Sequence, residues 1–241
     1  MSDYVIVTGA SKGLGLATSK ALLNVGYKVV AIARTFSDEL QALTETHSEL
    51  CHYIKSDLSD LENIPKLCRQ ITKQFGRPYG LINNAAVGHD GVLATMPNSD
   101  IDNIMRVNVQ APMLLSKYLM RSMLLNRTGR IINISSIIAK TGFNGLSVYG
   151  ASKAALEGFT KSLAREVGKA GVTVNCVAPG YMQTDMTDNL QGEKLESVKR
   201  RSPLGKLATV DDVADMVMYL LSQQAKSITG TVMTVDAGST A

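Results

Sequence analysis

The sequence predicts an α/β protein whose strands form one doubly wound parallel sheet. Short runs rich in β-branched residues alternate with longer amphipathic stretches along all 241 residues. The runs are apolar nearly throughout, as expected of parallel strands that helices cover on both faces. A glycine-rich turn directly follows the first run, which is typical of the Rossmann type of sheet. No change in composition marks a second domain, so residues 1–241 are expected to form a single domain.

Seven runs are expected to form the strands. They are Tyr4–Val7, Lys28–Ile32, Cys51–Ser56, Gly80–Asn83, Arg130–Ile134, Thr173–Val177 and Thr231–Val235. Helical patterns such as Leu14–Val25 and Ala154–Ala170 lie between them. This alternation predicts right-handed crossovers, with a ligand crevice at the carboxyl ends of the strands. Residues 183–207 interrupt the alternation with polar, charged and Gly/Pro positions, so we expect a helical substrate lid there.

Composition excludes several classes of protein. The net charge is +4, and the Lys and Arg residues are spread along the chain, which argues against a nucleic-acid partner. Cys51, Cys68 and Cys176 lack metal-ligand spacing, so we expect reduced, buried thiols and no metal site. The first strand begins almost at once and no apolar run could span a bilayer, which predicts a cytoplasmic protein without a membrane partner.

The glycine-rich turn carries Gly9, Gly13 and Gly15, spaced G-x3-G-x-G. Glycine allows a tight turn and a close backbone approach to a pyrophosphate. The following helix adds N-terminal amides and the positive end of its dipole. Such a turn alone is weak support, because turns need glycine anyway. Its place between the first strand and the first helix favours a dinucleotide site.

The end of the second strand suggests which dinucleotide binds. NAD-binding proteins usually place a carboxylate there for the adenosine ribose, but this strand ends Ile32-Ala33-Arg34, without a carboxylate. A guanidinium suits a 2′-phosphate, and Lys12 in the glycine turn can approach the same group. The alternative is two solvated surface cations. We expect NADP.

Two further positions are ambiguous from their residues alone. Asp57, just past the third strand, could accept a hydrogen bond from adenine or could be an ordinary turn aspartate. Asn83, Asn84 and Ala85 end the fourth strand, and the two amides either form a turn or line the crevice.

Tyr149, Lys153 and Ser136 form the pattern S-x12-Y-x3-K. On a helix, Tyr149 and Lys153 share a face. We expect the ammonium to lower the pKa of the phenol, which can then exchange a proton with a carbonyl oxygen, and Ser136 to donate to that oxygen. A Tyr-x3-Lys pair alone is common on helix surfaces. Together with the upstream glycine turn, the pattern predicts hydride transfer between a nicotinamide and a carbonyl or alcohol.

Asn108 lies inside the long helix that precedes the fifth strand, between Val107 and Val109. It could bind a water that relays protons to Lys153. Alternatively, it bends the helix.

Taken together, these residues show that the chain resembles the short-chain dehydrogenase/reductase family over nearly its whole length, and within it the 3-oxoacyl-acyl-carrier-protein reductases. Beyond the glycine turn and the Tyr-x3-Lys helix, the matching segments are Asn83–Ala85, Ile134–Ser136, Ser162–Val167, Val177–Gly180, Thr184–Met186 and Ile228–Gly230.

The resemblance implies a catalytic tetrad of Asn108, Ser136, Tyr149 and Lys153. It also implies a set of cofactor-binding residues: Gly9, Ser11, Lys12, Gly13, Leu14, Gly15, Arg34, Asp57, Leu58, Asn84, Ala85, Ala86, Tyr149, Lys153, Pro179, Gly180, Met182 and Thr184. Of these, Asp57 and Leu58 would meet the adenine, and residues 179–184 would surround the nicotinamide carboxamide.

Three positions depart from the family pattern. Ala86 replaces a glycine after Asn-Asn-Ala, and Ala237 replaces a glycine in the segment Asp236–Gly238. In the family, a basic pair docks the acidic carrier protein. Arg127 matches its first member, but Ala170 stands at the second, with Lys169 beside it.

The resemblance implies NADPH-dependent reduction of 3-oxoacyl groups on acyl carrier protein in fatty acid synthesis, by a homotetramer. An alternative is a reductase or dehydrogenase of a free ketone, sugar, steroid or quinone. An alternative of another class is a catalytically silent regulator that senses dinucleotides. Loss of Tyr149 or Lys153 would have favoured this alternative.

Overall fold

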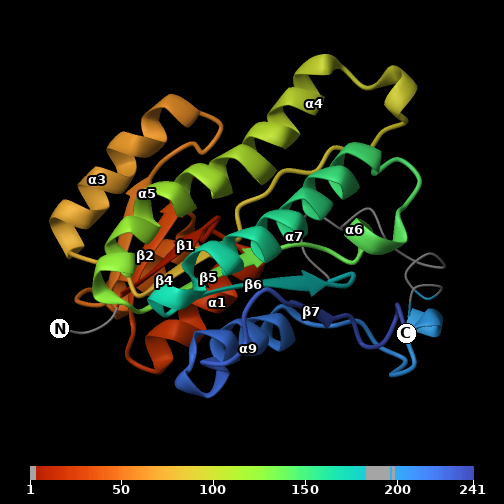
Figure 1. Cartoon of the computed structure of the whole chain (residues 1–241). Coiled ribbons are helices and arrows are strands. Elements are labelled where there is room, and N and C mark those ends of the chain that lie inside the picture. The colour runs from red at the N-terminus through yellow and green to blue at the C-terminus, as the bar shows by residue number, and fades with distance from the viewer. Residues whose placement is uncertain (1–3, 183–195, 197–198) are drawn as a thin grey trace.

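The computed structural model describes residues 4–182, 196 and 199–241. Its seven strands form one parallel sheet in the order β3-β2-β1-β4-β5-β6-β7 (Figure 1). The strands are β1 (Tyr4–Thr8), β2 (Lys28–Ala33), β3 (Cys51–Lys55), β4 (Gly80–Asn83), β5 (Gly129–Ile134), β6 (Val172–Pro179) and β7 (Val232–Val235). The strand order reverses between β1 and β4, as in a doubly wound sheet. The predicted fold class is confirmed.

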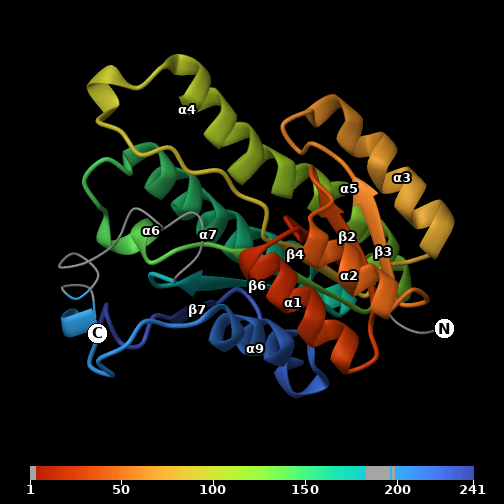
Figure 2. The same cartoon turned by 180° about the vertical axis from the view of Figure 1, so that it is seen from behind.

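Helices cover both faces of the sheet. One face carries α1 (Gly13–Asn24), α2 (Asp38–Thr46) and α9 (Val210–Leu221) (Figure 2). The other carries α3 (Ile64–Phe75), α5 (Ala111–Asn126) and α7 (Ser147–Val167). Side chains along a strand alternate between the two cores, so Val5 packs under α1 and α9 whereas Ile6 packs under α3 and α5.

Shorter elements extend this framework. They are α4 (Asn98–Met105), α6 (Ile138–Thr141), a π-helical turn (Arg106–Gln110) and 3-10 turns at Leu61–Asn63, Leu93–Thr95, Gly168–Ala170 and Gln223–Ala225. The π-helical turn joins α4 to α5 without a break in the helix, so both project along one face beside α7 (Figure 1).

Two expectations about the elements need correction. The expected burial on both faces describes β1, β4, β5 and β6, but β3 and β7 are partly exposed because they form the two edges of the sheet. The catalytic helix begins at Ser147 rather than Ala154, since small and polar residues hide the helical pattern of its first two turns.

Cys51, Cys68 and Cys176 are free and buried, as predicted. Within the described residues, no helix is both long and apolar enough to cross a membrane. The predicted lid falls largely on residues 183–195 and 197–198, which lie outside the described residues, so it stays a prediction.

Candidate active site

The glycine-rich turn folds back on its own backbone and on the end of β4. Gly9 has a φ of +68°, and a Cβ there would lie 2.9 Å from the Cα of Ala85. A Cβ on Gly15 would lie 2.2 Å from the carbonyl oxygen of Gly9. Both contacts are too short for any side chain. These glycines are therefore required by internal packing, and the close approach of a ligand to them stays a prediction.

Thr8 and Asn84 hold this turn against β4. The Thr8 hydroxyl accepts hydrogen bonds from the backbone amides of Asn84 and Ala85, each at 3.0 Å. The Asn84 carboxamide donates to the carbonyl oxygens of Thr8 at 2.9 Å and Gly9 at 3.3 Å. In the described contacts Asn84 therefore ties the turn in place. This role of Thr8 was not predicted from the sequence, although a hydroxyl at the end of a strand could have suggested it.

The start of α1 suits an anionic ligand. No acidic residue lies in its first turn, and no side chain caps its first amides. The Ser11 carbonyl accepts a hydrogen bond of 2.5 Å from Ser37, whose hydroxyl also caps α2, so the turn is anchored from both sides. Uncapped amides at a helix N-terminus are donors for phosphate oxygens. The residues present fit the pyrophosphate of a dinucleotide.

Arg34 and Asp57 lie just past the carboxyl ends of β2 and β3, and both are exposed. The Asp57 carboxylate accepts from the amide and the hydroxyl of Ser59, at 2.9 and 2.8 Å. These bonds, and then the positive charge of Arg34, lower the pKa of Asp57 despite partial burial. In this structure Asp57 therefore makes the contacts of an ordinary turn aspartate. Binding of adenine by Asp57 and Leu58 stays a prediction, as does the approach of Lys12 and Arg34 to a 2′-phosphate.

We predict that Gly15→Ala will abolish cofactor binding and lower the melting temperature, because its methyl group would collide with the Gly9 carbonyl. The matched control is Gly158→Ala on α7, where an added Cβ meets no atom within 4 Å. Alanine there should leave binding unchanged and stabilise the helix slightly. Thermal unfolding and cofactor titration of both variants test this. Equal behaviour of the two variants would contradict it.

Three predicted catalytic side chains come together at the carboxyl edge of the sheet. Ser136 follows β5, and its hydroxyl shares a hydrogen bond with the phenol of Tyr149 on α7. The Lys153 ammonium lies 5.5 Å from the centre of the Tyr149 ring and donates a 2.8 Å hydrogen bond to the carbonyl oxygen of Ile134. The Ser-Tyr-Lys arrangement predicted from the sequence is therefore formed by the fold.

The pKa of Tyr149 differs from the expectation. Burial raises it to about 12, although the hydrogen bond from Ser136 opposes the rise. Burial also lowers the pKa of Lys153 to about 8. The phenol pKa is thus raised rather than lowered as expected, because desolvation is the largest effect on it and the Lys153 ammonium is directed to the Ile134 carbonyl. Stabilisation of a phenolate by Lys153 stays a prediction. At neutral pH the phenol keeps its proton and can donate it.

Asn108 is fully buried in the π-helical turn. Its carboxamide pairs with both backbone groups of Val87, at 2.8 and 2.9 Å, and donates to Ser152 at 3.1 Å. It therefore fixes the loop after β4 against α7. The sequence left open whether Asn108 binds a water or bends the helix. The π-helical turn around Asn108 agrees with a bend, since π-helical turns distort helices. The water relay stays a prediction.

A buried polar network supports the catalytic helix and was not predicted. Asn83 donates to Asn133 at 2.8 Å, and Asn133 donates to Thr160 of α7 at 2.8 Å. Ser135 contacts the Lys153 carbonyl at 3.2 Å and the Glu157 carboxylate at 3.1 Å. The signal in the sequence that could have indicated this network is the polar residues at the ends of the apolar strands β4 and β5. The network fixes the helix relative to β4 and β5.

The end of β6 and the residues after it are held by backbone hydrogen bonds to the segment after Ser136 and to β7. The Pro179 carbonyl accepts from the amide of Ile137 at 3.0 Å, and Gly180 donates to Val235 at 2.9 Å. Met182 is half-buried against the core under α1 and α9. Thr184 lies outside the described residues. Contacts of these residues with a nicotinamide stay predictions.

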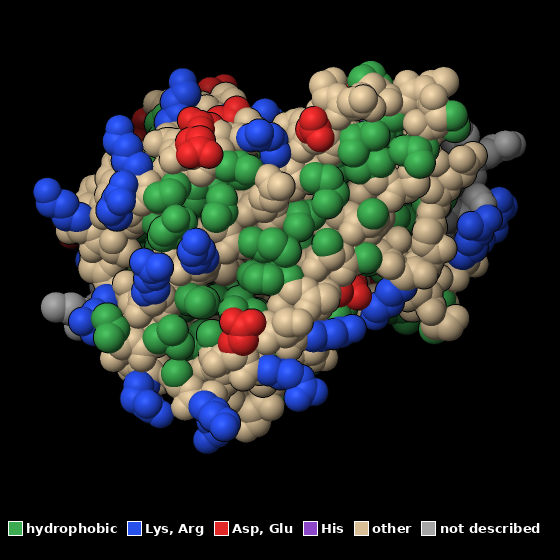
Figure 3. All heavy atoms as spheres, turned by 45° about the horizontal axis from the view of Figure 1, so that its top comes forward, with side chains coloured by type: hydrophobic (Ala, Val, Ile, Leu, Met, Phe, Trp, Pro, Cys, Tyr) green, Lys and Arg blue, Asp and Glu red, His purple; other side chains and the backbone are tan. Residues whose placement is uncertain are grey.

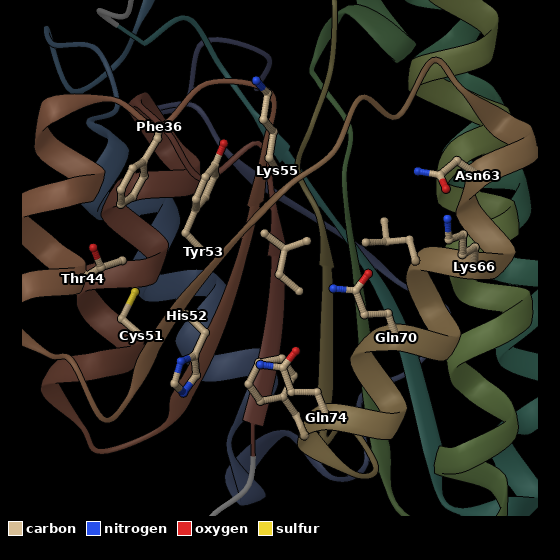
Figure 4. A pocket seen from close by; sticks show the side chains of 13 residues that line it. Phe36, Thr44, Cys51, His52, Tyr53, Lys55, Asn63, Lys66, Gln70 and Gln74 are labelled. Carbon is tan, nitrogen blue, oxygen red and sulfur yellow. The ribbon is translucent and has the colours of Figure 1, made fainter.

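Another hollow lies away from these residues. A groove of about 680 Å³ lies beside the edge strand β3, with Lys66 and Gln70 of α3 on one side and Phe36 and Tyr53 on the other (Figure 4). It contains none of the predicted site residues. Among the described residues, no three His, Cys, Asp or Glu side chains gather as metal ligands.

Comparisons with known proteins agree with this geometry. A family model described as enoyl-(acyl carrier protein) reductase matches residues 9–240. The 3-oxoacyl-[acyl-carrier-protein] reductase FabG of Escherichia coli (strain K12) is 36% identical over 233 residues, or 97% of this chain and 95% of the relative. The FabG of Haemophilus influenzae is 38% identical, with 97% and 96% covered. The chain belongs to the short-chain dehydrogenase/reductase family. It is an oxidoreductase acting on CH–OH or C=O groups.

Solved structures share the fold. A gluconate 5-dehydrogenase from Burkholderia cenocepacia J2315, in complex with NADP and tartrate, superposes with a TM-score of 0.93 at 23% identity, covering 100% of this chain and 96% of that one. A putative NAD(P)-dependent gluconate 5-dehydrogenase from Beutenbergia cavernae, with bound NADP, gives 0.92 at 29% identity, with 98% and 96% covered.

Proposed function

We propose that the protein is an NADPH-dependent reductase of 3-oxoacyl thioesters carried on acyl carrier protein. The observation that carries the chemistry is the protonated Tyr149 phenol, hydrogen-bonded to Ser136 and beside Lys153, at the same edge of the sheet as the glycine turn. Curated relatives named 3-oxoacyl-[acyl-carrier-protein] reductase, at 36–38% identity over nearly the whole chain, support the substrate.

NADP is the cofactor. Both solved structures described above contain NADP, and no carboxylate follows β2 here to repel a 2′-phosphate. Arg34 and Lys12 would hold that phosphate, and the amides of α1 would hold the pyrophosphate. When bound, NADPH supplies the hydride.

The side chains would divide the remaining chemistry. The substrate carbonyl oxygen sits between Ser136 and Tyr149, and Ser136 donates a hydrogen bond as negative charge develops on it. Tyr149 then transfers its phenolic proton to that oxygen. Lys153 stabilises the phenolate that remains, and Asn108 keeps the loop at Val87 in place beside α7.

Cofactor choice should depend on Arg34. We expect the wild type to prefer NADPH, and Arg34→Asp to weaken NADPH binding while sparing NADH, because a charge-assisted contact is replaced by like-charge repulsion. Titration of both variants with both cofactors measures this. Equal affinity of the wild type for NADH and NADPH would show the assignment of Arg34 to be wrong.

The proposed carrier site is formed by Arg127 and the neighbouring Lys169, which lie where α5 and α7 end, although Ala170 stands at the second position of the family's basic pair. Arg127 is exposed, has a φ of 52°, and donates a 3.1 Å hydrogen bond to the Lys169 carbonyl. These residues lie at the amino end of β5 and β6, the opposite edge of the sheet from Ser136. A carrier docked there would lie at the other end of the strands from the Ser136 site of the same subunit.

We propose a cytoplasmic homotetramer. Hydrophobic side chains gather across the face that α4, α5 and α7 present (Figure 3). Among the exposed large apolar residues, Val92 and Leu93 lie just before α4, at 61% and 54%, and Leu125 lies near the end of α5, at 73%. Large exposed apolar patches are typical of protein–protein contacts, among other sites, and a subunit interface would cover this face.

Carrier docking should depend on Arg127. We expect Arg127→Glu to raise the KM for a carrier-linked substrate while a small free thioester is nearly unaffected, since a rim cation mainly governs encounter with an acidic partner. Steady-state kinetics with acetoacetyl carrier protein and acetoacetyl-N-acetylcysteamine compare the two. An equal change with both substrates, or none with either, would argue against a carrier partner.

The function itself is tested by a substrate panel. We expect NADPH oxidation with an acetoacetyl thioester to have a higher kcat/KM than with free ketones, sugars, steroids or quinones. A higher value for one of those free compounds would instead support the alternative carbonyl reductase. No turnover of any carbonyl compound would favour the silent dinucleotide sensor.

A further inference from the structure

The outer edge of β3 is open. In the described sheet β3 pairs with β2 alone. The carbonyl of Leu50 accepts a 2.7 Å hydrogen bond from β2, and the amide of Ser56 donates one of 3.0 Å to β2. In a parallel ladder, every second residue of a strand bonds to the same neighbour. Between Leu50 and Ser56, this alternation directs the backbone groups of Cys51, Tyr53 and Lys55 away from β2.

Two of these outward amides have no partner in the part of the chain that the structure describes. The Cys51 amide donates to the carbonyl of His47, just after α2, at 2.8 Å, so it does face away from β2. No hydrogen bond joins the amide of Tyr53 or Lys55 to another described group. Because an edge strand offers such groups to any extended chain beside it, β3 can pair with one more strand.

A groove of about 680 Å³ lies along this open edge, between α2 and α3 (Figure 4). Phe36 and Tyr53 form one wall, which we call the aromatic wall. Their rings stack at 4.3 Å between centres, and Phe36 is 40% exposed. Lys66 and Gln70 belong to the other side, the α3 wall. Successive side chains of an extended chain point to opposite faces, so a chain added to β3 would direct one set to each wall.

The charges around this groove favour an anionic partner. Lys55 and Lys66 line it, and no Asp or Glu does so among the described residues. Along its whole length, α3 carries Lys and Arg side chains and no acidic residue. Neither Lys55 nor Lys66 forms an ion pair with a described residue. Glu45 of α2 lies outside the lining, where it accepts a hydrogen bond from its own helix. Carboxylates on a partner therefore meet uncompensated cations.

We propose that β3 binds an acidic, extended segment of a partner protein as an added strand. The outward backbone groups of Tyr53 and Lys55 hold its main chain, its apolar side chains pack on the aromatic wall, and its carboxylates face the α3 wall. A second copy of this chain fits less well, because a two-fold contact would bring two cationic grooves together. The groove contains none of the proposed catalytic or cofactor-binding residues, so this binding is independent of the proposed function.

A fluorescein-labelled octapeptide of alternating valine and glutamate is the probe, titrated with the full chain by fluorescence anisotropy. We expect saturable binding, and about tenfold weaker binding of the same peptide with lysine in place of glutamate. Lys66→Glu should weaken binding of the glutamate peptide about tenfold, since attraction becomes repulsion. Arg69→Glu is the matched control, because it makes the same change of charge on α3 outside the groove lining, and its effect should stay within about twofold. Both variants should keep the wild-type melting temperature.

Two N-methylated forms of the glutamate peptide test pairing through the backbone. One is methylated at the amide of every valine and the other at the amide of every glutamate, so each blocks the donors along one edge of the strand. Only one edge of the peptide can face β3. One form should therefore lose binding about tenfold or more, and the other should bind like the parent peptide.

Four results would overturn this proposal. The first is no saturable binding of the glutamate peptide, and the second is equal affinity for the lysine peptide. The third is an equal loss in Arg69→Glu, and the fourth is an equal response to both methylated forms. If the glutamate peptide does not bind and Lys66→Glu changes the oligomeric size in analytical ultracentrifugation, the open edge belongs to a second copy of the chain instead.

Discussion

Tyr149→Phe is expected to lower kcat about 10²–10⁴-fold, because a positioned general acid contributes about that much to the rate. The substitution removes only the hydroxyl that shares a hydrogen bond with Ser136. The ring keeps its packing, so the melting temperature and the affinity for NADPH should be retained. Steady-state turnover measured together with cofactor titration gives both quantities.

Tyr181→Phe is the matched control, since it removes the neighbouring phenol. It should keep most of the wild-type kcat. If Tyr149→Phe retained more than about a tenth of wild-type turnover, the loss in rate would be smaller than a general acid contributes. The proton would then have to come from another group.

Lys153→Met is expected to abolish most turnover and yet to stabilise the fold. Lys153 is 2% exposed and its pKa is lowered to about 8, so the folded protein carries an unfavourably buried charge at neutral pH. A shift of that size corresponds to about 3 kcal/mol. The lost hydrogen bond to Ile134 offsets about 1 kcal/mol of this gain. We therefore expect the free energy of unfolding to rise by about 2 kcal/mol at pH 7.

The difference in stability between the wild type and Lys153→Met should depend on pH. The folded-state pKa of Lys153 lies below its ordinary value of 10.5, so the unfolded chain binds the proton more tightly. Stability of the wild type should therefore rise between about pH 8 and 10.5, and the advantage of Lys153→Met should disappear over that interval. Denaturant unfolding at both ends of the interval measures it. A variant less stable than the wild type at pH 7 would mean that the ammonium is stabilising.

The same pKa values define a pH profile for activity. The Tyr149 phenol stays protonated up to about pH 12, whereas Lys153 loses its charge near pH 8. The kcat/KM for reduction should therefore fall above about pH 8.

The parts of the site that depend on residue type and order along the chain could be predicted from the sequence. The glycine turn and the Ser-Tyr-Lys pattern could be placed because parallel strands bring the residues after them to one edge. Contacts between distant segments could not be predicted. The bonds from Thr8 to β4 and from Asn133 to Thr160 depend on tertiary packing, and so does the burial that raises the pKa of Tyr149.

One departure from the family pattern gained a physical meaning in the structure. Ala237 has a φ of 56°, a left-handed conformation that glycine adopts without strain, which explains the usual glycine there. Its carbonyl accepts the hydrogen bond of Ser202. The strained residue therefore accepts the contact that joins the segment at Ser202 to the chain after β7.

The most direct measurement of the central claim uses NADPH deuterated at the nicotinamide C4, on either face, with an acetoacetyl thioester as substrate. If the Ser136-Tyr149-Lys153 site reduces the ketone, one of the two labelled cofactors must deliver one deuterium to carbon 3 of the hydroxyacyl product. Tyr149→Phe should show the same label at a much lower rate. A thioester left unreduced, or a product without deuterium from either cofactor, would contradict the account.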